Sequence, residues 1–220
     1  VFGEKPSPDT LLSAMEANFE GHDALRHRLK NAPKMGNDDD RADKHAIWLL
    51  DTFADAVQGL TNERGGCVRA GTGSAMFYIF HAYELGATAD GRERGTPLPA
   101  NYAPSLNVKL IGPVSLIKSF TKPNLGRVIN GGPLTIEFSE SVFTQDESIT
   151  KVAQLVRLFV LRGGHQLQLN TVNRDRLLDA QAHPENYRNL IVRVWGWSGY
   201  FVELDKCYQD HIIRRAELNL

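Results

Sequence analysis

The sequence predicts an α/β fold, because segments with helical periodicity alternate with segments of strand-like pattern. Apolar residues recur every three or four positions over residues 8–20, 38–60 and 149–161, a spacing typical of helices that pack on a core. Apolar and polar residues alternate over 134–138 and 165–172, as they do in strands with one covered face. Gly and Pro are concentrated between these segments and predict the loops.

Composition indicates a folded, water-soluble chain and excludes several classes of protein. Of the 220 residues, 42% are apolar and 23% are charged, which is close to the average for globular proteins. The formal net charge of -1 provides no broad attraction to nucleic acid or membranes, so we expect neither as a partner. No apolar stretch reaches the roughly 18 residues needed to cross a bilayer.

The number and spacing of the cysteines indicate the redox compartment. Cys67 and Cys207 are the only two and form no CxxC pair, which argues against a disulfide framework or a zinc ribbon. Sparse thiols suit a reducing cytosol. The first residue is Val1 and not Met, so we expect the chain to be cut from a longer protein.

Three helices are expected in the first 60 residues. Ser7, or Asp9 one step inside, is placed to cap the first helix. Leu25 and Leu29 lie one turn apart and predict a second, short helix. The third begins at three consecutive aspartates, 38–40, whose negative charge favours a helix N-terminus. A metal site is the lesser interpretation of these aspartates, because no glycine-bearing loop with a distal Glu follows.

The middle of the chain is rich in Gly and Pro. The apolar run 75–80 predicts a buried strand, and 86–105 predicts a long, ordered loop of functional importance. Asp90 and Arg92 in this loop either hold loops together near a site or are purely structural. Glycines and hydroxyls at 71–74 suggest a phosphate loop, but no GK[ST] follows, so we discount it.

The second half of the chain alternates helices and strands. After a short helix at 114–120 and the strand at 134–138, the helix at 149–161 is expected to point five side chains inward: Val152, Leu155, Val156, Phe159 and Val160. The elements expected after it are a strand at 165–172, a helix at 174–181, a β-branched strand at 190–195 and a last helix at 206–216.

The segment RVWGWSGYF, residues 193–201, is unusual on physical grounds. Gly196 interrupts a strand pattern between Trp195 and Trp197, and glycine weakens a strand unless a bend or a close backbone approach is needed. A tight turn packed under aromatic rings is the plain interpretation of the spacing.

This segment resembles the glycyl radical signature, in which a strand-to-turn segment holds a radical on glycine. Further segments are similar to the same family in the same order and cover nearly the whole chain: NFEGHDALR, NAPKMGNDDD, RAGTGS, GATADGR, GGHQLQLN, DAQAHPENYRNLIVRV and YQDHIIRRAE. The resemblance implies the C-terminal part of a ten-stranded α/β barrel of the glycyl radical enzyme type. Its divisions are a helical barrel segment at 1–64, a loop-rich barrel segment at 65–100 and a glycyl radical domain at 101–220.

The resemblance also implies a chemistry. Gly196 would store the radical, because delocalisation into the flanking amide groups requires a planar α-carbon that a side chain would disturb. A radical S-adenosylmethionine activating enzyme with an iron–sulfur cluster would install the radical, and no other cofactor would be bound. The cysteine that takes over the radical lies upstream in the family, so we expect this chain to be incomplete without that segment. Trp195 and Trp197 could exclude water and oxygen from the radical.

The resemblance further implies a setting and a substrate. Sensitivity to oxygen, which cleaves the backbone at the glycine, points to an anaerobic cytoplasm, and the enzyme would be a homo-oligomer or carry small accessory subunits. Trp-Gly-Trp is most similar to the arylalkyl- and alkylsuccinate synthases (benzylsuccinate synthase among them), which add fumarate to a hydrocarbon. Diol dehydratase, choline trimethylamine-lyase, arylacetate decarboxylase and formate acetyltransferase types stay open. So does a non-catalytic replacement subunit.

The remaining candidate residues have weaker patterns. The histidines at 22, 45, 81, 165, 183 and 211 show no HxxxH spacing, which gives little support for a metal site. His165 could line the barrel, but we interpret it as a hydrogen-bonded structural residue. Nothing nearby would tune the thiols of Cys67 or Cys207, so both are expected to be structural.

Overall fold

The computed structural model describes residues 5–74, 77–143, 146–194 and 196–216. The α-helices are α1 (Pro8–Glu16), α2 (Asp23–Asn31), α3 (Asp40–Val57), α4 (Phe77–Glu84), α5 (Pro113–Phe120), α6 (Asp146–Leu161), α7 (Arg174–Ala182) and α8 (Lys206–Ala216). The strands are β1 (Leu134–Ser139), β2 (Leu167–Val172), β3 (Ile191–Arg193) and β4 (Ser198–Tyr200). Short 3₁₀ turns lie at Leu125–Arg127, Glu140–Phe143, Pro184–Asn186 and Phe201–Glu203.

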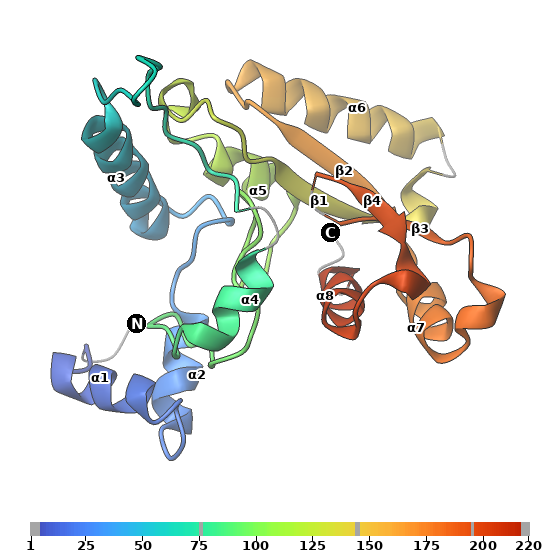
Figure 1. Cartoon of the computed structure of the whole chain (residues 1–220), viewed down its shortest axis with the longest axis horizontal. Helices are drawn as coiled ribbons and strands as arrows, with labels where there is room; N and C mark the ends of the chain where they lie inside the picture. The colour runs from blue at the N-terminus through green and yellow to red at the C-terminus, as the bar shows by residue number, and fades with distance from the viewer. Residues whose placement is uncertain (1–4, 75–76, 144–145, 195, 217–220) are drawn as a thin grey trace.

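A parallel strand pair forms the centre of the fold. β1 pairs with β2 in the register Leu134↔Leu167, and α6 makes the crossover between them, as a parallel connection requires. Figure 1 shows α6 along one side of the pair, with α7 and α8 on the opposite side. The other sheet that the described residues form is the antiparallel hairpin of β3 and β4.

Alternation along β1 gives its two faces different partners. Leu134, Ile136 and Phe138 are buried and pack with apolar residues of α5 and α6. Thr135 and Glu137 point to the opposite face, where α8 contacts the strand. Because both faces are covered, the polar residues of this strand are buried as well. The apolar face stabilises the fold, and the polar face places Thr135 and Glu137 against α8.

Helix caps and boundaries agree with several predictions. The Ser7 side chain accepts from the Thr10 amide and caps α1, and Asp39 caps α3 by accepting from the Arg41 amide. The aspartate run is therefore a helix start, as expected. The first helix ends at Glu16, before residue 20, because Phe19 adopts a φ of 65° and is buried against Ala14.

The predicted strand at 75–80 is wrong where the structure describes it. Residues 75 and 76 lie outside the described part, and Phe77 begins α4. Tyr78, Ile79 and Ala82 are buried, a spacing that belongs to one helical face. A short run that is apolar at every position carries no periodicity, so its sequence could not distinguish helix from strand.

The predicted inward face of α6 is right on one side only. Val152 and Phe159 are buried and Leu155 packs on the core, but Val156 is 37% exposed and Val160 is 64% exposed. The neighbours of α6 in the described chain are α5 and the strand pair, and they cover a narrower face than the apolar stripe of the sequence.

Candidate functional site

Gly196 lies at the tip of the β3–β4 hairpin. Arg193 is opposite Ser198, and the Val194 amide donates to the Trp197 carbonyl over 2.9 Å, so the chain reverses direction between Val194 and Trp197. Gly196 has a φ of +75°, in the left-handed region that glycine adopts without steric cost. The turn that the plain interpretation predicted is present and favours glycine, but Gly196 is exposed and the packing under aromatic rings is not seen in the described residues.

The α-carbon of Gly196 is open to its surroundings. The residue is exposed, and a methyl group on this carbon would meet no atom within 4 Å beyond those of its chain neighbours. The ring of Trp197 lies against Gly199, where an added Cβ would come within 2.7 Å of Trp197 Cζ3. Trp195 lies outside the described residues. Apart from its two chain neighbours, no described residue therefore occupies the space that a side chain at this position would fill.

Core packing and a backbone hydrogen bond hold the strand that leads into the turn. Val192 and Val194 are buried in a cluster that also contains Phe201 and the apolar face of α8, including Ile212. The Phe201 amide donates to the Leu190 carbonyl over 2.8 Å and closes the base of the hairpin. The tip is thus exposed while its base is part of the core.

A buried ion pair links the same strand to the parallel sheet. Arg215 Nε lies 2.9 Å from Glu137 Oε1, and the two side chains are 6% and 7% exposed. Arg215 also donates to the backbone carbonyls of Arg193, at 3.1 Å, and Val194, at 3.4 Å. From β2, Asn170 donates to Glu137 Oε1 over 3.1 Å. Glu137 is therefore the junction between both parallel strands and α8.

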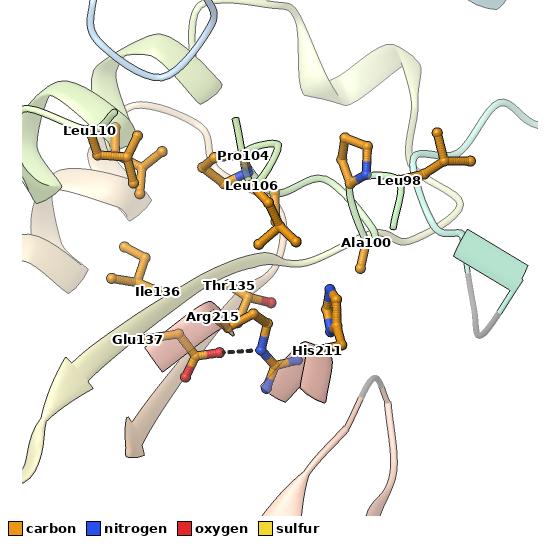
Figure 2. Close-up of a pocket in the computed structure, with 13 residues that line it drawn as sticks. Leu98, Ala100, Pro104, Leu106, Leu110, Thr135, Ile136, Glu137, His211 and Arg215 are labelled. Atoms are coloured by element: carbon orange, nitrogen blue, oxygen red, sulfur yellow. Dashed lines mark ion pairs between the residues drawn. The ribbon is translucent and has the colours of Figure 1, made fainter. Parts of the chain in front are cut away.

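A pocket lies on the other side of this ion pair (Figure 2). Its roof consists of apolar side chains from the segment 98–110, and its floor is formed by Thr135, Glu137, His211 and Arg215. Thr135 Oγ1 and Glu137 Oε2 are buried and have no hydrogen-bond partner among the described residues. Because unpaired buried oxygens are costly, the pocket suits a small molecule that brings hydrogen-bond donors to them.

His211 gives this region a pH dependence. Burial, and then the charges of Arg215 and Arg214, lower the pKa of His211 from 6.5 to about 3. Below pH 6.5 the unfolded chain binds a proton that the folded chain does not, so stability present above pH 6.5 is lost as the pH falls towards 3. We expect wild type to lose about 1 kcal/mol more than H211Q between pH 7.5 and 5.5, measured by urea unfolding. Equal losses of unfolding free energy in the two proteins would contradict the lowered pKa of His211.

Comparison with known proteins decides the family. The family model described as "Glycine radical" matches residues 99–202, and the model "Pyruvate formate lyase-like" matches residues 1–80. The chain belongs to the glycyl radical enzyme family. The predicted domain boundaries stay predictions, since residues 81–98 lie between the two matches.

Individual glycyl radical enzymes resemble nearly all of this chain. Trans-4-hydroxy-L-proline dehydratase of Clostridioides difficile is 35% identical over 99% of the chain, which spans 28% of that relative. (2S)-3-sulfopropanediol dehydratase of Klebsiella oxytoca is 30% identical over the full chain, which spans 27% of it. The glycerol-bound B12-independent glycerol dehydratase of Clostridium butyricum superposes with a TM-score of 0.92 at 33% identity, covering 97% of this chain and 27% of that one. The α/β structure thus matches the C-terminal part of the family's barrel fold, as predicted.

The other predicted candidates of this glycyl radical enzyme chain lie in varied surroundings. Cys67 is exposed and pairs with Thr61 in an isolated bridge, whereas Cys207 packs partly buried on the cluster that contains Val194. His165 contacts the ring of Tyr102, and burial lowers its pKa. Neither ring nitrogen of His165 has a hydrogen-bond partner in the described chain, so the predicted hydrogen-bonded role is wrong.

The loop candidates are structural. Arg92 is buried and donates to the carbonyls of Gly86, Glu93 and Thr96. Thr72, in the discounted phosphate loop, donates to the Gly131 carbonyl instead. The described residues contain no cluster of three or more His, Cys, Asp or Glu that could hold a metal ion. Within that same part of the chain, no helix is both long and apolar enough to cross a membrane.

Glu137 and Arg215 were not among the residues predicted from the sequence. One signal was present: a glutamate stands at an alternate position of an otherwise apolar and hydroxyl-bearing strand, LTIEFS. A second was the one-turn spacing of His211 and Arg215 on the last helix. Neither signal identifies the partner, because the two members of the ion pair are far apart in sequence.

Proposed function

We propose that this chain supplies the radical-bearing hairpin of a glycyl radical enzyme of the dehydratase or lyase type, with Gly196 as the residue that stores the radical. The observation that carries the proposal is the open α-carbon of Gly196 at a hairpin tip, inside the segment matched by the glycine radical model. Loss of one hydrogen atom from this carbon leaves an unpaired electron that spreads into both flanking amide groups. An alanine would resist the planar geometry that this requires.

The proposal includes partners outside this chain. A radical S-adenosylmethionine activating enzyme would take the hydrogen atom from Gly196, and a cysteine in another segment would pass the radical to the substrate. The chain itself would bind no further cofactor. A homo-oligomer, or a complex with small accessory subunits, in an anaerobic cytoplasm remains part of the proposal.

Two observations favour dehydration or a related elimination over the expected addition of fumarate to a hydrocarbon. The relatives described above are dehydratases of hydroxylated substrates by name, and they give fumarate addition no support. The pocket whose floor includes Glu137 and Arg215 also contains an unpaired carboxylate oxygen and an unpaired hydroxyl. A hydrocarbon would leave both unsatisfied, whereas a diol or a hydroxy amino acid would pair with them.

Electron paramagnetic resonance tests the radical first. The full-length protein is activated anaerobically with its activating enzyme, and we expect a doublet, because one hydrogen remains on the radical carbon. Incorporation of glycine deuterated at the α-carbon should collapse the doublet. A signal that keeps its splitting after this labelling would place the radical elsewhere, and the absence of any signal would contradict the proposal.

Substrate trials on the activated protein then test the reaction class. The panel contrasts small diols and hydroxyprolines with fumarate plus toluene. Carbonyl or dehydrated products from the first group support the proposal. A succinate adduct from the second would restore fumarate addition and overturn the dehydratase assignment.

Thr135→Val tests the pocket with a nearly isosteric change. Removing an unpaired buried hydroxyl should leave the unliganded protein as stable as wild type, or about 1 kcal/mol more stable. The KM for a hydroxylated substrate should rise about tenfold, since one hydrogen bond is lost. A matched control is Thr121→Val, because Thr121 Oγ1 is also buried but donates to the Ile117 carbonyl away from the pocket. An unchanged KM in the Thr135 variant would remove the pocket from the substrate path.

A further inference from the structure

We propose that Arg215 is a positioning residue for Gly196, and that Glu137 anchors it to the parallel sheet. Arg215 reaches from α8 to the carbonyls of Arg193 and Val194, the residues three and two positions before Gly196. These contacts hold the backbone that leads into the turn and leave the tip untouched. The consequence for radical chemistry rests on the proposed function, whereas the positioning itself does not.

The hairpin needs such a support because its own pairing is short. β3 and β4 have three residues each, and a two-stranded hairpin of this size is marginal in water. The side chains of Ile191 and Tyr200, which are opposite each other, are 61% and 44% exposed. Within the described residues the support comes from the base of the hairpin, where Val192 and Val194 are buried and where Arg215 binds the backbone.

The arginine is suited to this role by its fork of donors. Nη1 and Nη2 donate to two successive backbone carbonyls, and Nε lies against the Glu137 carboxylate. One planar guanidinium group therefore contacts three acceptors. Figure 2 shows Arg215 pointing from α8 to Glu137 on β1. A lysine in this place would be a single point charge and could not make all three contacts in a fixed geometry.

Glu137 makes the arrangement possible energetically. Arg215 is 5% exposed, and a buried guanidinium needs a buried anion to offset its desolvation. Glu137 is held in turn by Asn170, which fixes Oε1 towards Arg215. Displacement of the hairpin, by an activating enzyme or by motion, must therefore break charged contacts that both strands of the parallel sheet support.

Hydrogen–deuterium exchange of the full-length protein measures this directly. The readout is the exchange rate of peptides that cover residues 190–201, relative to peptides from β1 and α6. We expect R215Q to raise hairpin exchange about tenfold or more, because two charge-assisted contacts are lost. R215K should give an intermediate increase. The matched control is D43N, which removes another buried carboxylate, between α3 and α5, and should leave hairpin exchange unchanged relative to the rest.

A double variant separates positioning from simple loss of folding. E137Q and R215Q each leave one buried charge alone, whereas E137Q/R215Q leaves none and should melt closer to wild type. Its hairpin should still exchange about tenfold faster than wild type, since neutral amides bind the carbonyls less strongly. If the double variant is folded and its hairpin exchanges at the same rate as that of the wild type, the proposal is overturned. Unfolding of both R215K and the double variant would also overturn it, since the residue would then be required by the whole fold.

Radical measurements link the positioning to function. After anaerobic activation, R215K should lose its doublet severalfold faster than wild type in trace oxygen, because the hairpin is displaced more often. Equal radical lifetimes with faster exchange would refute the link to radical protection. If wild type forms no doublet at all, the proposed function fails while the exchange result still decides the positioning role.

Discussion

Gly196→Ala is expected to give a folded protein that forms no radical and has no turnover above background. Alanine at a φ of +75° costs about 1 kcal/mol, and the added methyl group meets no atom within 4 Å beyond those of its chain neighbours, so the fold should survive. The α-carbon would, however, carry a substituent that hinders planarity and access. Activity assays and electron paramagnetic resonance of the anaerobically treated variant check the prediction.

Gly163→Ala is the matched control for this change. Gly163 has the same φ of +75° and equally open surroundings, but it lies at the end of α6 and away from the hairpin. Both variants should lose similar stability, and only Gly196→Ala should lose the doublet. A full doublet in Gly196→Ala, or its loss in Gly163→Ala, would contradict the assignment of the radical to position 196.

Asp43→Asn is expected to lower the free energy of unfolding by about 3 kcal/mol. Asp43 is fully buried, accepts from the Ser119 hydroxyl over 2.5 Å and lies 2.7 Å from Lys122 Nζ. Ser119 in turn accepts from the Gly36 amide, so one carboxylate joins α3, α5 and the loop between α2 and α3. An asparagine would direct an N–H group towards the ammonium group or leave the hydroxyl unpaired. Urea unfolding followed by fluorescence gives the measurement.

Asp40→Asn isolates the effect of burial from that of charge. Asp40 lies 2.6 Å from the same Lys122 Nζ, but its side chain is 89% exposed. Its loss should therefore cost less than about 1 kcal/mol. Equal losses from the two variants would mean that the ammonium group, and not the buried junction, determines the stability of this region.

Local chemistry made part of this structure predictable from sequence. Ser7 caps its helix as expected, and Asp39 caps α3 within the aspartate run that was expected to begin a helix, because a capping side chain bonds an amide two or three residues away. The strands that begin at Leu134 and Leu167 were predicted by alternation, since each presents one apolar face to α5 and α6. The glycine of the hairpin was identified from its aromatic neighbours and its family resemblance, and the structure gives it a backbone conformation that favours glycine.

Long-range partners explain what the sequence could not provide. Glu137 and Arg215 are 78 positions apart, and no local rule connects a strand residue to a residue of the last helix. His165 was expected to be hydrogen-bonded, but its surroundings are set by Tyr102, which is distant in sequence. The exposed side of α6 likewise depends on which elements cover it. Periodicity shows that a face is apolar, and only the assembled chain shows how much of it is covered.

The burial of α8 determines what would remain after oxygen cut the chain at position 196. Tyr208 and Ile212 of this helix are 5% and 1% exposed, and the helix also carries Arg215. None of these contacts needs the peptide bonds around Gly196, so the severed tail would stay docked in the interior. The cut protein would then keep its folded core while having lost the glycine that the proposal requires. Replacing the cut segment with an intact copy would first require α8 to leave the core. Such a replacement should therefore be slow unless the surrounding structure partly unfolds.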